Sequence, residues 1–315
     1  MVRYIGMRLL LAVGVLWAAY TVTFVILFMV PGDPISAMAA GGMDSGTVSP
    51  EQLDAMRAEY GFDQPLPVQY GQYLFAALQG DLGTSVQTGQ PVTTAIGQVL
   101  WPTVELSIAA LVVAVIFGGA IALIATYTNL RWLRETLLAI PPLAISLPTF
   151  WIGLLLIQWF SFSWNIFPAM GNDGFSALVL PAITLGLPIS ALVAQVLAKS
   201  LQEAAIDPYV TTARAKGISR IRVHLGHVLR NATLPSLTMV GLIAGNLLAG
   251  SVIVETVFSR QGVGQLTVQS VTMQDLPVVQ GVVVFGAVVF IAANLIVDLL
   301  LPVADPRVTV GRSYA

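Results

Sequence analysis

The sequence predicts an all-α integral membrane protein with six transmembrane helices, and two observations carry that prediction. Of the 315 residues, 56% are hydrophobic and only 10% are charged, against roughly 25% charged residues in soluble domains. The mean hydropathy is correspondingly high, at +0.83. The chain also contains uncharged runs that exceed the roughly 20 residues a helix needs to cross a bilayer. These runs cover residues 9–32, 106–130, 136–172, 174–198, 231–254 and 276–297.

The distribution of lysine and arginine predicts that both termini lie in the cytoplasm. Positively charged residues concentrate in the cytoplasmic loops of membrane proteins. With the N-terminus inside, 12 of the 14 lysine and arginine residues fall on the cytoplasmic side, and only Arg57 and Arg260 fall outside. The opposite orientation would invert this ratio.

The chain contains no cysteine, which excludes disulfides, thiolate metal sites and thiol catalysis. The apolar run at residues 9–30 is too long for the core of a signal peptide, so we interpret it as the first transmembrane helix. The predicted domains are residues 1–30 for this helix, 31–98 for an extracytoplasmic helical domain, 99–303 for the main membrane domain and 304–315 for a cytoplasmic tail.

The segment 31–98 carries signals for short helices between turns. A rigid turn at residues 31–34 follows the first span. Pro50 suits the first position of a helix that ends at Gly61. Pro67 begins a second helix, which Gly80 closes. We therefore expect a small outer domain of helices and not a linker.

Two acidic residues lie at the predicted ends of spans, Glu105 at the start of the second and Glu255 after the fifth. Charges at membrane depth are costly and typically face a cavity or a partner, so both are candidates for lining a polar pathway. The alternative for Glu105 is an interfacial position where its carboxylate reaches water. Arg260 is a candidate partner for Glu255, from proximity in the sequence.

The segment 207–235 is densely charged and lies between two long apolar runs. Asp207 can cap a helix, Pro208 suits its first position, and Gly217 suits the left-handed residue that ends it. Ser219 can cap a second, basic and amphipathic helix. Two short exposed helices suggest a docking platform for another protein, whereas the alternative is an ordinary positively charged cytoplasmic loop. The predicted apolar face of the second helix consists of Ile221, Leu225, Val228, Leu229 and Ala232.

This segment resembles the coupling loop of ABC-importer permeases of the dipeptide, oligopeptide and nickel class. The broader importer family usually carries Glu-Ala-Ala where this chain has Thr211, Thr212 and Ala213, and the peptide and nickel branch commonly lacks that glutamate. The likeness continues in the outer segment, in residues 255–264 and near the C-terminus. The outer domain is typical of the first of two paired permeases, the "B" subunit. The residues that carry the resemblance in the loop are Asp207-Pro208-Tyr209-Val210-x-Thr212-Ala213-Arg214-Ala215-Lys216-Gly217, then His227-x-Leu229-Arg230-Asn231-Ala232-x-x-Pro235.

The resemblance implies a type I ABC importer permease fold over residues 99–303. Its coupling loop, residues 204–232, would insert a short helix into a cleft of an ATP-hydrolysing subunit. Glu105 and Glu255 become candidates for the translocation pathway. Asp33, Asp63, Asp81 and Arg260 are candidates for contact with an extracytoplasmic binding protein, although turn formation is the ordinary role of Asp63 and Asp81. The expected coupling residues are Asp207, Tyr209, Val210, Thr212, Ala213, Arg214, Ala215, Lys216 and Gly217.

The resemblance also implies a bacterial inner-membrane location and a set of partners. These are a homologous second permease, two ATPase subunits or a fused pair, and an extracytoplasmic solute-binding lipoprotein. The chain lacks the Gly-x-x-x-x-Gly-Lys-Ser/Thr loop that cradles nucleotide phosphates, so it is not expected to be an enzyme. ATP and Mg are expected on the ATPase chains. We expect no cofactor, no metal and no nucleic acid on this one.

Short peptides are the expected substrate, and nickel, a metallophore or another small solute stays an alternative. An intramembrane hydrolase would need a nucleophile and a base within reach, yet both histidines, His224 and His227, lie in the basic loop. A proton- or ion-coupled transporter would need charge relays inside the bundle. The acidic residues available for that role, Glu105, Glu255 and Asp298, lie near helix ends.

Overall fold

The computed structural model describes residues 2–29, 50–59 and 63–304. Within them the chain is helical, and apart from an isolated bridge between Thr84 and Pro91 these residues contain no strand. The chain divides into two compact units, Met1–Thr103 with Gln261–Ile291 and Val104–Arg260 with Ala292–Ala315.

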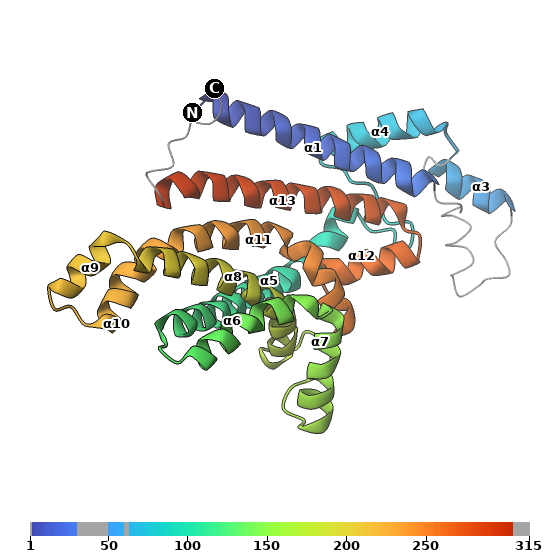
Figure 1. The fold of residues 1–315 in the computed structure, drawn as a ribbon. Coiled ribbons are helices and arrows are strands. Elements are labelled where there is room, and N and C mark those ends of the chain that lie inside the picture. Colours follow the sequence, from blue (N-terminus) through green and yellow to red (C-terminus); the bar gives the residue numbers. More distant parts are fainter. Residues whose placement is uncertain (1, 30–49, 60–62, 305–315) are drawn as a thin grey trace. The chain divides into compact units, whose positions relative to one another are not determined.

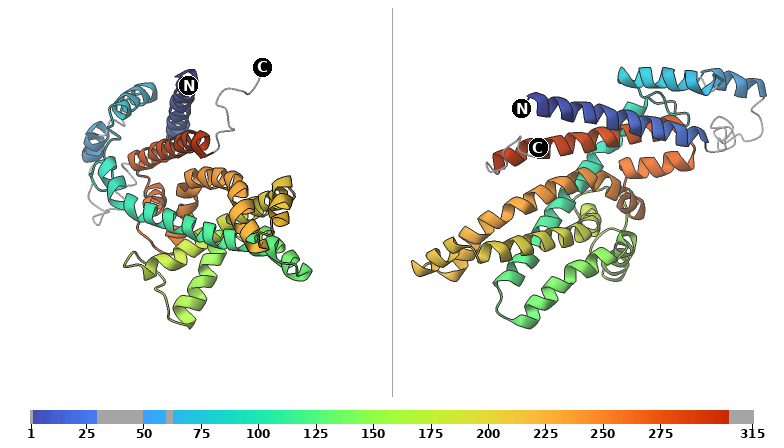
Figure 2. Two further views of the ribbon diagram at one scale, coloured as in Figure 1. Left: turned by 90° about the vertical axis from the view of Figure 1, so that its left-hand side faces the viewer. Right: turned by 45° about the horizontal axis from the view of Figure 1, so that its top comes forward.

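The first unit packs an N-terminal helix against the start of a C-terminal one (Figure 1). Helices α1 and α13 lie side by side in each view (Figures 1 and 2), and the side-chain amide of Gln280 donates a hydrogen bond to Tyr20 O at 3.0 Å. The Tyr70 hydroxyl lies 2.8 Å from Thr21 Oγ1, which fastens α4 to α1. The elements are α1 (Val2–Met29), α3 (Pro50–Glu59), α4 (Leu66–Leu78), the start of α5 (Val92–Tyr127), α12 (Val263–Thr272) and the first part of α13 (Leu276–Ala304).

A buried carboxylate holds the loop between α4 and α5. Asp275 precedes α13 and accepts a hydrogen bond from Ser85 Oγ at 2.5 Å, with the backbone N–H of Val86 donating at 3.3 Å. A buried carboxyl group is tolerated only when hydrogen-bond partners of this kind surround it. Beneath the loop, Val92 packs against Val278 in a small apolar core.

The second unit is a helical bundle built around α8, along which α11 runs (Figure 2). Small residues allow its helices to approach closely: a Cβ added at Gly186 would lie 2.7 Å from Ala110 O on α5. Leu106, Leu180 and Phe258 fill the core of the unit. The elements are the rest of α5, α6 (Arg131–Ser146), α7 (Thr149–Leu156), the π-helix η1 (Ile157–Ser163), α8 (Ser176–Ala205), α9 (Pro208–Ala215), α10 (Arg220–Val223), the π-helix η2 (His224–Val228), α11 (Leu229–Val257) and the end of α13.

In the part of the chain that the structure describes, four helices are long and apolar enough to cross a membrane, or five if a bent pair counts as one. The four segments are Gly6–Leu27, Val92–Tyr127, Ser176–Ala205 and Leu276–Ile296. The predicted fifth span falls within α11, which is not among them. The count of six therefore stays a prediction.

The third predicted span, residues 136–172, is not one straight helix. It is divided between α6 and the α7–η1 helix, which meet at an angle of 103°. Leu147 between them is extended, with φ −85° and ψ 132°, and Pro148 follows. A residue before proline is driven out of the helical region by the proline ring, which accounts for the break.

The local predictions in the outer segment are largely confirmed. Helix α3 begins at Pro50, and α4 is followed by Gly80 in the left-handed region at φ +86°. The turn at residues 31–34 and the predicted stop at Gly61 lie outside the described residues. The helix of the second span is longer than predicted, because α5 begins at Val92. The predicted domain boundary between residues 98 and 99 therefore falls inside α5.

Candidate functional site

The basic segment forms the predicted short helix, α9, between α8 and α10. Pro208 occupies its first turn, and Gly217 ends it with φ +77°, a conformation that glycine adopts without a Cβ penalty. The Gly217 N–H donates to Arg214 O at 2.9 Å. Asp207 stands at the N-cap position but makes no side-chain capping hydrogen bond, so the predicted role of its carboxylate is wrong.

Helix α9 has one face turned to its own chain and one face turned away. Val210 is 2% exposed and Ala213 is 8% exposed, and both pack in a cluster with Leu201 of α8 and Val228 of η2. The Tyr209 hydroxyl donates to Ala204 O at 3.3 Å. The predicted coupling residues therefore fall into two groups, one that fixes the helix and one that is presented. The presented ones are Thr212, Arg214, Ala215 and Lys216, with Asp207 and Gly217 exposed at the two ends of the helix. Thr211 is exposed beside them and was not among the predicted residues.

The second predicted helix is not a separate element. Helices α10, η2 and α11 follow one another without a gap, so one helical segment runs from Arg220 to Val257. Its buried face agrees with the prediction in part. Val228 and Ala232 are buried as predicted, whereas Ile221 and Leu225 are 53% and 48% exposed and Val223 is buried. A π-helix has more residues per turn than an α-helix, and it brings positions five apart onto one face.

An open hollow of 610 Å³ lies in this unit between the end of α5 and the α10–η2 segment. The Arg220 guanidinium lies 4.7 Å from the ring centroid of Tyr127 and donates to Tyr127 O. His224 Nε2 lies 3.3 Å from Thr126 Oγ1. Burial lowers the pKa of His224 below its ordinary value, because desolvation disfavours the charged imidazolium. Sequence reasoning missed this cluster, whose only signal was the spacing of Arg220 and His224 by one helical turn.

The two pathway candidates differ in their surroundings. Arg260, only 1% exposed, donates from Nη2 to Glu105 Oε2 at 2.7 Å, across 155 positions of sequence. The Arg260 N–H also donates to Glu255 O at 2.8 Å, so the two residues predicted to pair are joined through their backbones. Glu255 itself is fully buried. Glu105 thus has a cationic partner that the sequence did not reveal, and its carboxylate remains partly exposed.

The candidates for contact with a binding protein differ in their surroundings. Asp33 lies outside the described residues. Asp63 and Asp81 are exposed, and the Gly83 N–H donates to the Asp81 carboxylate at 2.8 Å, as in an ordinary turn. Arg260 is enclosed by its own chain, so its side chain does not offer a surface to an approaching protein. Among the described residues, no group of three or more His, Cys, Asp or Glu side chains could hold a metal ion.

Residues 114–310 match the family described as "Binding-protein-dependent transport system inner membrane component". This chain belongs to that family. Residues 1–107 match a companion family described as "Binding-prot-dependent transport system membrane comp, N-term". The family membership confirms the resemblance drawn from the coupling segment and identifies the chain as a permease subunit of a binding-protein-dependent ABC importer.

Known members of the family extend the comparison. The chain is 38% identical over 242 residues to the "Glutathione transport system permease protein GsiC" of Escherichia coli, covering 77% of this chain and 78% of that protein. The protein of the same name from Salmonella choleraesuis is 37% identical over the same coverage. Together with the apolar helices, this membership makes the chain a multi-pass protein of the inner membrane.

Two solved transporters share the fold. One is described as "Crystal structure of an amino acid ABC transporter with histidines", with a TM-score of 0.53, 20% identity, and coverage of 66% of this chain and 94% of that one. The other is the MetNI methionine ABC transporter in an inward-facing conformation, with a TM-score of 0.51, 17% identity and coverage of 66% and 97%. At these identities the likeness concerns the fold alone, which is that of an ABC importer permease.

Proposed function

We propose that this chain forms half of a translocation pathway for short peptides and drives it through α9. The substrate proposal is supported by the relatives named for glutathione, a small peptide, at 37% and 38% identity. Nickel or a metallophore is the second candidate, because the resemblance places the chain in a class that serves both. No side-chain cluster among the described residues favours a resident metal.

The single observation that carries the coupling proposal is the two-sided character of α9. Val210 and Ala213 anchor the helix to the chain's own core, so its position is set without help from a partner. Thr212, Ala215 and Lys216 are left on the other side, small or polar and exposed. A short helix held this way presents a defined shape to a cleft in another protein, whereas a loop that acted only through its charge would need no such anchoring.

The proposed complex contains a homologous second permease, two ATPase subunits or a fused pair, and an extracytoplasmic solute-binding lipoprotein. ATP and Mg bind to the ATPase subunits in this scheme. The present chain hydrolyses nothing, which agrees with the lack of a phosphate-binding Gly-x-x-x-x-Gly-Lys-Ser/Thr sequence. Movement of the ATPase subunits shifts α9 and opens the pathway alternately to the two sides of the membrane.

The proposed topology has six crossings, with both termini in the cytoplasm and the segment 31–98 outside. A cysteine introduced at the exposed Asp63 should react with a membrane-impermeant maleimide added to spheroplasts, whose inner membrane is intact. A cysteine at the exposed Ser219 should react only after permeabilisation. The unmodified chain is the control, because it contains no cysteine. Labelling of Ser219→Cys on intact cells would reverse the orientation.

The substrate proposal is tested by uptake in cells that express the complete transporter and lack their own peptide importers. We expect saturable, ATP-dependent uptake of labelled glutathione or tripeptides, and no uptake of ⁶³Ni above that of cells without this chain. Native mass spectrometry of the binding protein should show a peptide ligand. Nickel uptake without peptide uptake would reject the peptide proposal while leaving the coupling role of α9 in place.

A further inference from the structure

Helix α8 is the most enclosed of the four spanning segments in the described part of the chain. The rest of the chain buries 67% of its apolar stretch, against 28% or less in the other three. Between Ala177 and Ala194 no residue of α8 is exposed, and Gln195 is the first side chain to emerge. A polar face thus opens partway along a helix that is otherwise packed. The exposed residues of α8 are all polar, namely Ser176, Gln195, Lys199, Gln202 and Glu203.

Gln195 and Lys199 lie on one face of α8, because positions four apart in a helix are neighbours on its surface. The helix has 30 residues and is about 45 Å long, so Gln195 lies about 7 Å from its midpoint and Lys199 about 13 Å. With α8 centred in the bilayer, both lie within the half-thickness of the hydrocarbon core, about 15 Å, whereas Gln202 lies outside it at about 17 Å. Gln195 and Lys199 thus form a polar strip at membrane depth, in the half of α8 that leads into α9.

The exposed face of α5 shows what this unit turns toward lipid. Ile108, Val112 and Ile116 are exposed there, and all three are apolar. A side-chain amide moved from water into hydrocarbon loses its hydrogen bonds and is strongly disfavoured. Polar residues within a membrane accordingly face a water-filled cavity or a partner. The polar strip of α8 therefore does not belong to the lipid-facing surface.

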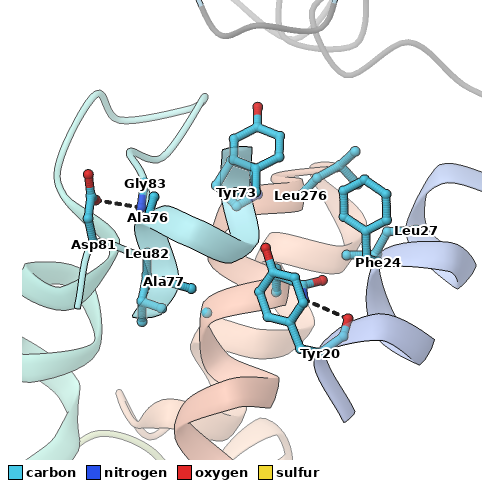
Figure 3. A pocket seen from close by; sticks show the side chains of 13 residues that line it. Tyr20, Phe24, Leu27, Tyr73, Ala76, Ala77, Asp81, Leu82, Gly83 and Leu276 are labelled. Atoms are coloured by element: carbon cyan, nitrogen blue, oxygen red, sulfur yellow. Dashed lines mark hydrogen bonds between the residues drawn. The ribbon is translucent and has the colours of Figure 1, made fainter. Parts of the chain in front are cut away.

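A glutamine of another spanning segment shows how a carboxamide at membrane depth is held within the chain. Gln280 of α13 donates from Nε2 to Tyr20 O at 3.0 Å, and Figure 3 draws this bond at Tyr20. Apolar side chains such as Phe24 and Leu276 line the cavity beside it. The Gln195 carboxamide, in contrast, has no hydrogen-bond partner among the described residues. Its NH₂ group and its oxygen are both open to water or to a ligand.

The charges on this face favour a water-filled wall over a packed seam with a second permease. Charged residues are depleted from the cores of protein interfaces, whereas the side chains of Lys199 and Glu203 are 79% and 67% exposed. Toward the outer end of the same face, Leu192 and Pro188 are apolar and half-buried. The face therefore becomes more polar and more exposed toward α9, as the wall of a path that opens on that side does.

We infer that Gln195 and Lys199 line the translocation pathway and contact the transported peptide. The inference rests on the proposed function and assigns two residues to the wall. A carboxamide both donates and accepts, so Gln195 can pair with the N–H and C=O groups of a peptide backbone. The Lys199 ammonium, one helical turn away, suits the C-terminal carboxylate of a short peptide. Its contact with Glu203, at 4.0 Å between exposed groups, is weak and leaves donors free for a second partner.

The first test uses the absence of cysteine from the chain. Gln195→Cys and Ile116→Cys are made singly in the complete transporter, held in bilayer discs whose two faces are both open to a charged methanethiosulfonate reagent. Because a thiol among lipid chains is poorly ionised, Gln195→Cys should react about tenfold faster or more than Ile116→Cys. The mass of the isolated chain reports the modification. Equal rates would overturn the pathway assignment, whether lipid or the second permease covers the strip.

The second test reads the contact with the peptide through the ratio of two uptake rates. Cells that lack their own peptide importers and express the complete transporter are given a tripeptide and the same tripeptide with a C-terminal amide. Lys199→Gln should lower the preference for the free carboxylate about fivefold, the upper range for an exposed ion pair. The charge-matched control Arg134→Gln, exposed on α6, should leave the preference unchanged. The binding protein is the same throughout, so its own selectivity cancels from the comparison.

The outcomes separate this inference from the proposed function. An unchanged ratio in Lys199→Gln, with normal uptake of both peptides, would overturn the peptide contact and leave the substrate proposal standing. If the wild-type transporter takes up neither peptide, the substrate proposal fails, and the labelling rates of the first test still decide whether Gln195 lines the pathway.

Discussion

Ala215→Arg is expected to abolish uptake and to release the ATPase subunits while the permease remains folded. Ala215 is exposed on the face of α9 that turns away from its own chain. An arginine there adds bulk and charge to a surface that must fit a cleft, and the loss of a central interface contact costs about 2 kcal/mol or about 30-fold in affinity. The measurements are co-purification of the ATPase subunits and peptide uptake in cells.

Two further arginine variants separate docking from charge and from folding. Gln202→Arg adds the same charge at an exposed position on α8 and should preserve uptake. Ala213→Arg is the same substitution two positions earlier in α9. Ala213, however, faces the buried cluster shared with α8 and η2, so this variant should lower the yield of folded chain. Normal assembly and uptake in Ala215→Arg would reject the coupling role and leave the segment as a determinant of topology.

Glu105→Gln should destabilise the assembled permease by about 3 kcal/mol, at the lower end of the range for breaking a buried ion pair. The Arg260 guanidinium is almost completely buried and its Nε and Nη1 have no hydrogen-bond partner among the described residues, so loss of Glu105 removes the anion that its Nη2 contacts. The lower end of the range applies because the Glu105 side chain is 42% exposed.

The matched experiment is a double-mutant cycle with Arg260→Met, read as thermal inactivation of the complex in detergent. Replacing both partners removes the stranded charge, so the double variant should be more stable than Glu105→Gln alone. If the effects of the two single changes simply add, the pair contributes no interaction of its own. Glu255 is also near Arg260 in the sequence, so the thermal inactivation of Glu255→Gln is compared with that of Glu105→Gln.

The sequence predicted best where structure is decided by neighbours along the chain. The boundaries of α9 were predicted from Pro208 and Gly217. The proline ring fixes its own φ and glycine can adopt a positive φ, so both effects depend on the residue itself and not on distant contacts. The buried face of the next segment was predicted in part. Val228 and Ala232 are buried, but a period of 3.6 also assigned Ile221 and Leu225 to that face, and both are exposed. The π-helical turn His224–Val228 changes the period within this segment, so that Val223 and Val228, five positions apart, share the buried face.

Contacts between distant residues were beyond sequence reasoning. Arg260 was matched to Glu255, five residues away, whereas its guanidinium contacts Glu105. Ser85 and Asp275 are separated by 190 positions, and nothing in either local sequence predicts their hydrogen bond. The third apolar run was predicted as one span, whereas the structure divides it into two pieces that meet at 103° and that both pack against α8.

The bend at Leu147 and Pro148 bears on whether the chain crosses the membrane an even or an odd number of times before it reaches α9. If the bent pair α6 and α7 returned to the side from which it came, only α8 would separate the loop that holds Arg131 from the loop that holds α9. Those two basic loops would then lie on opposite faces of the membrane, against the preference of positive charge for the cytoplasm. If the pair crosses, both loops share one face. The geometry of two residues thus decides on which side of the membrane every later part of the chain lies.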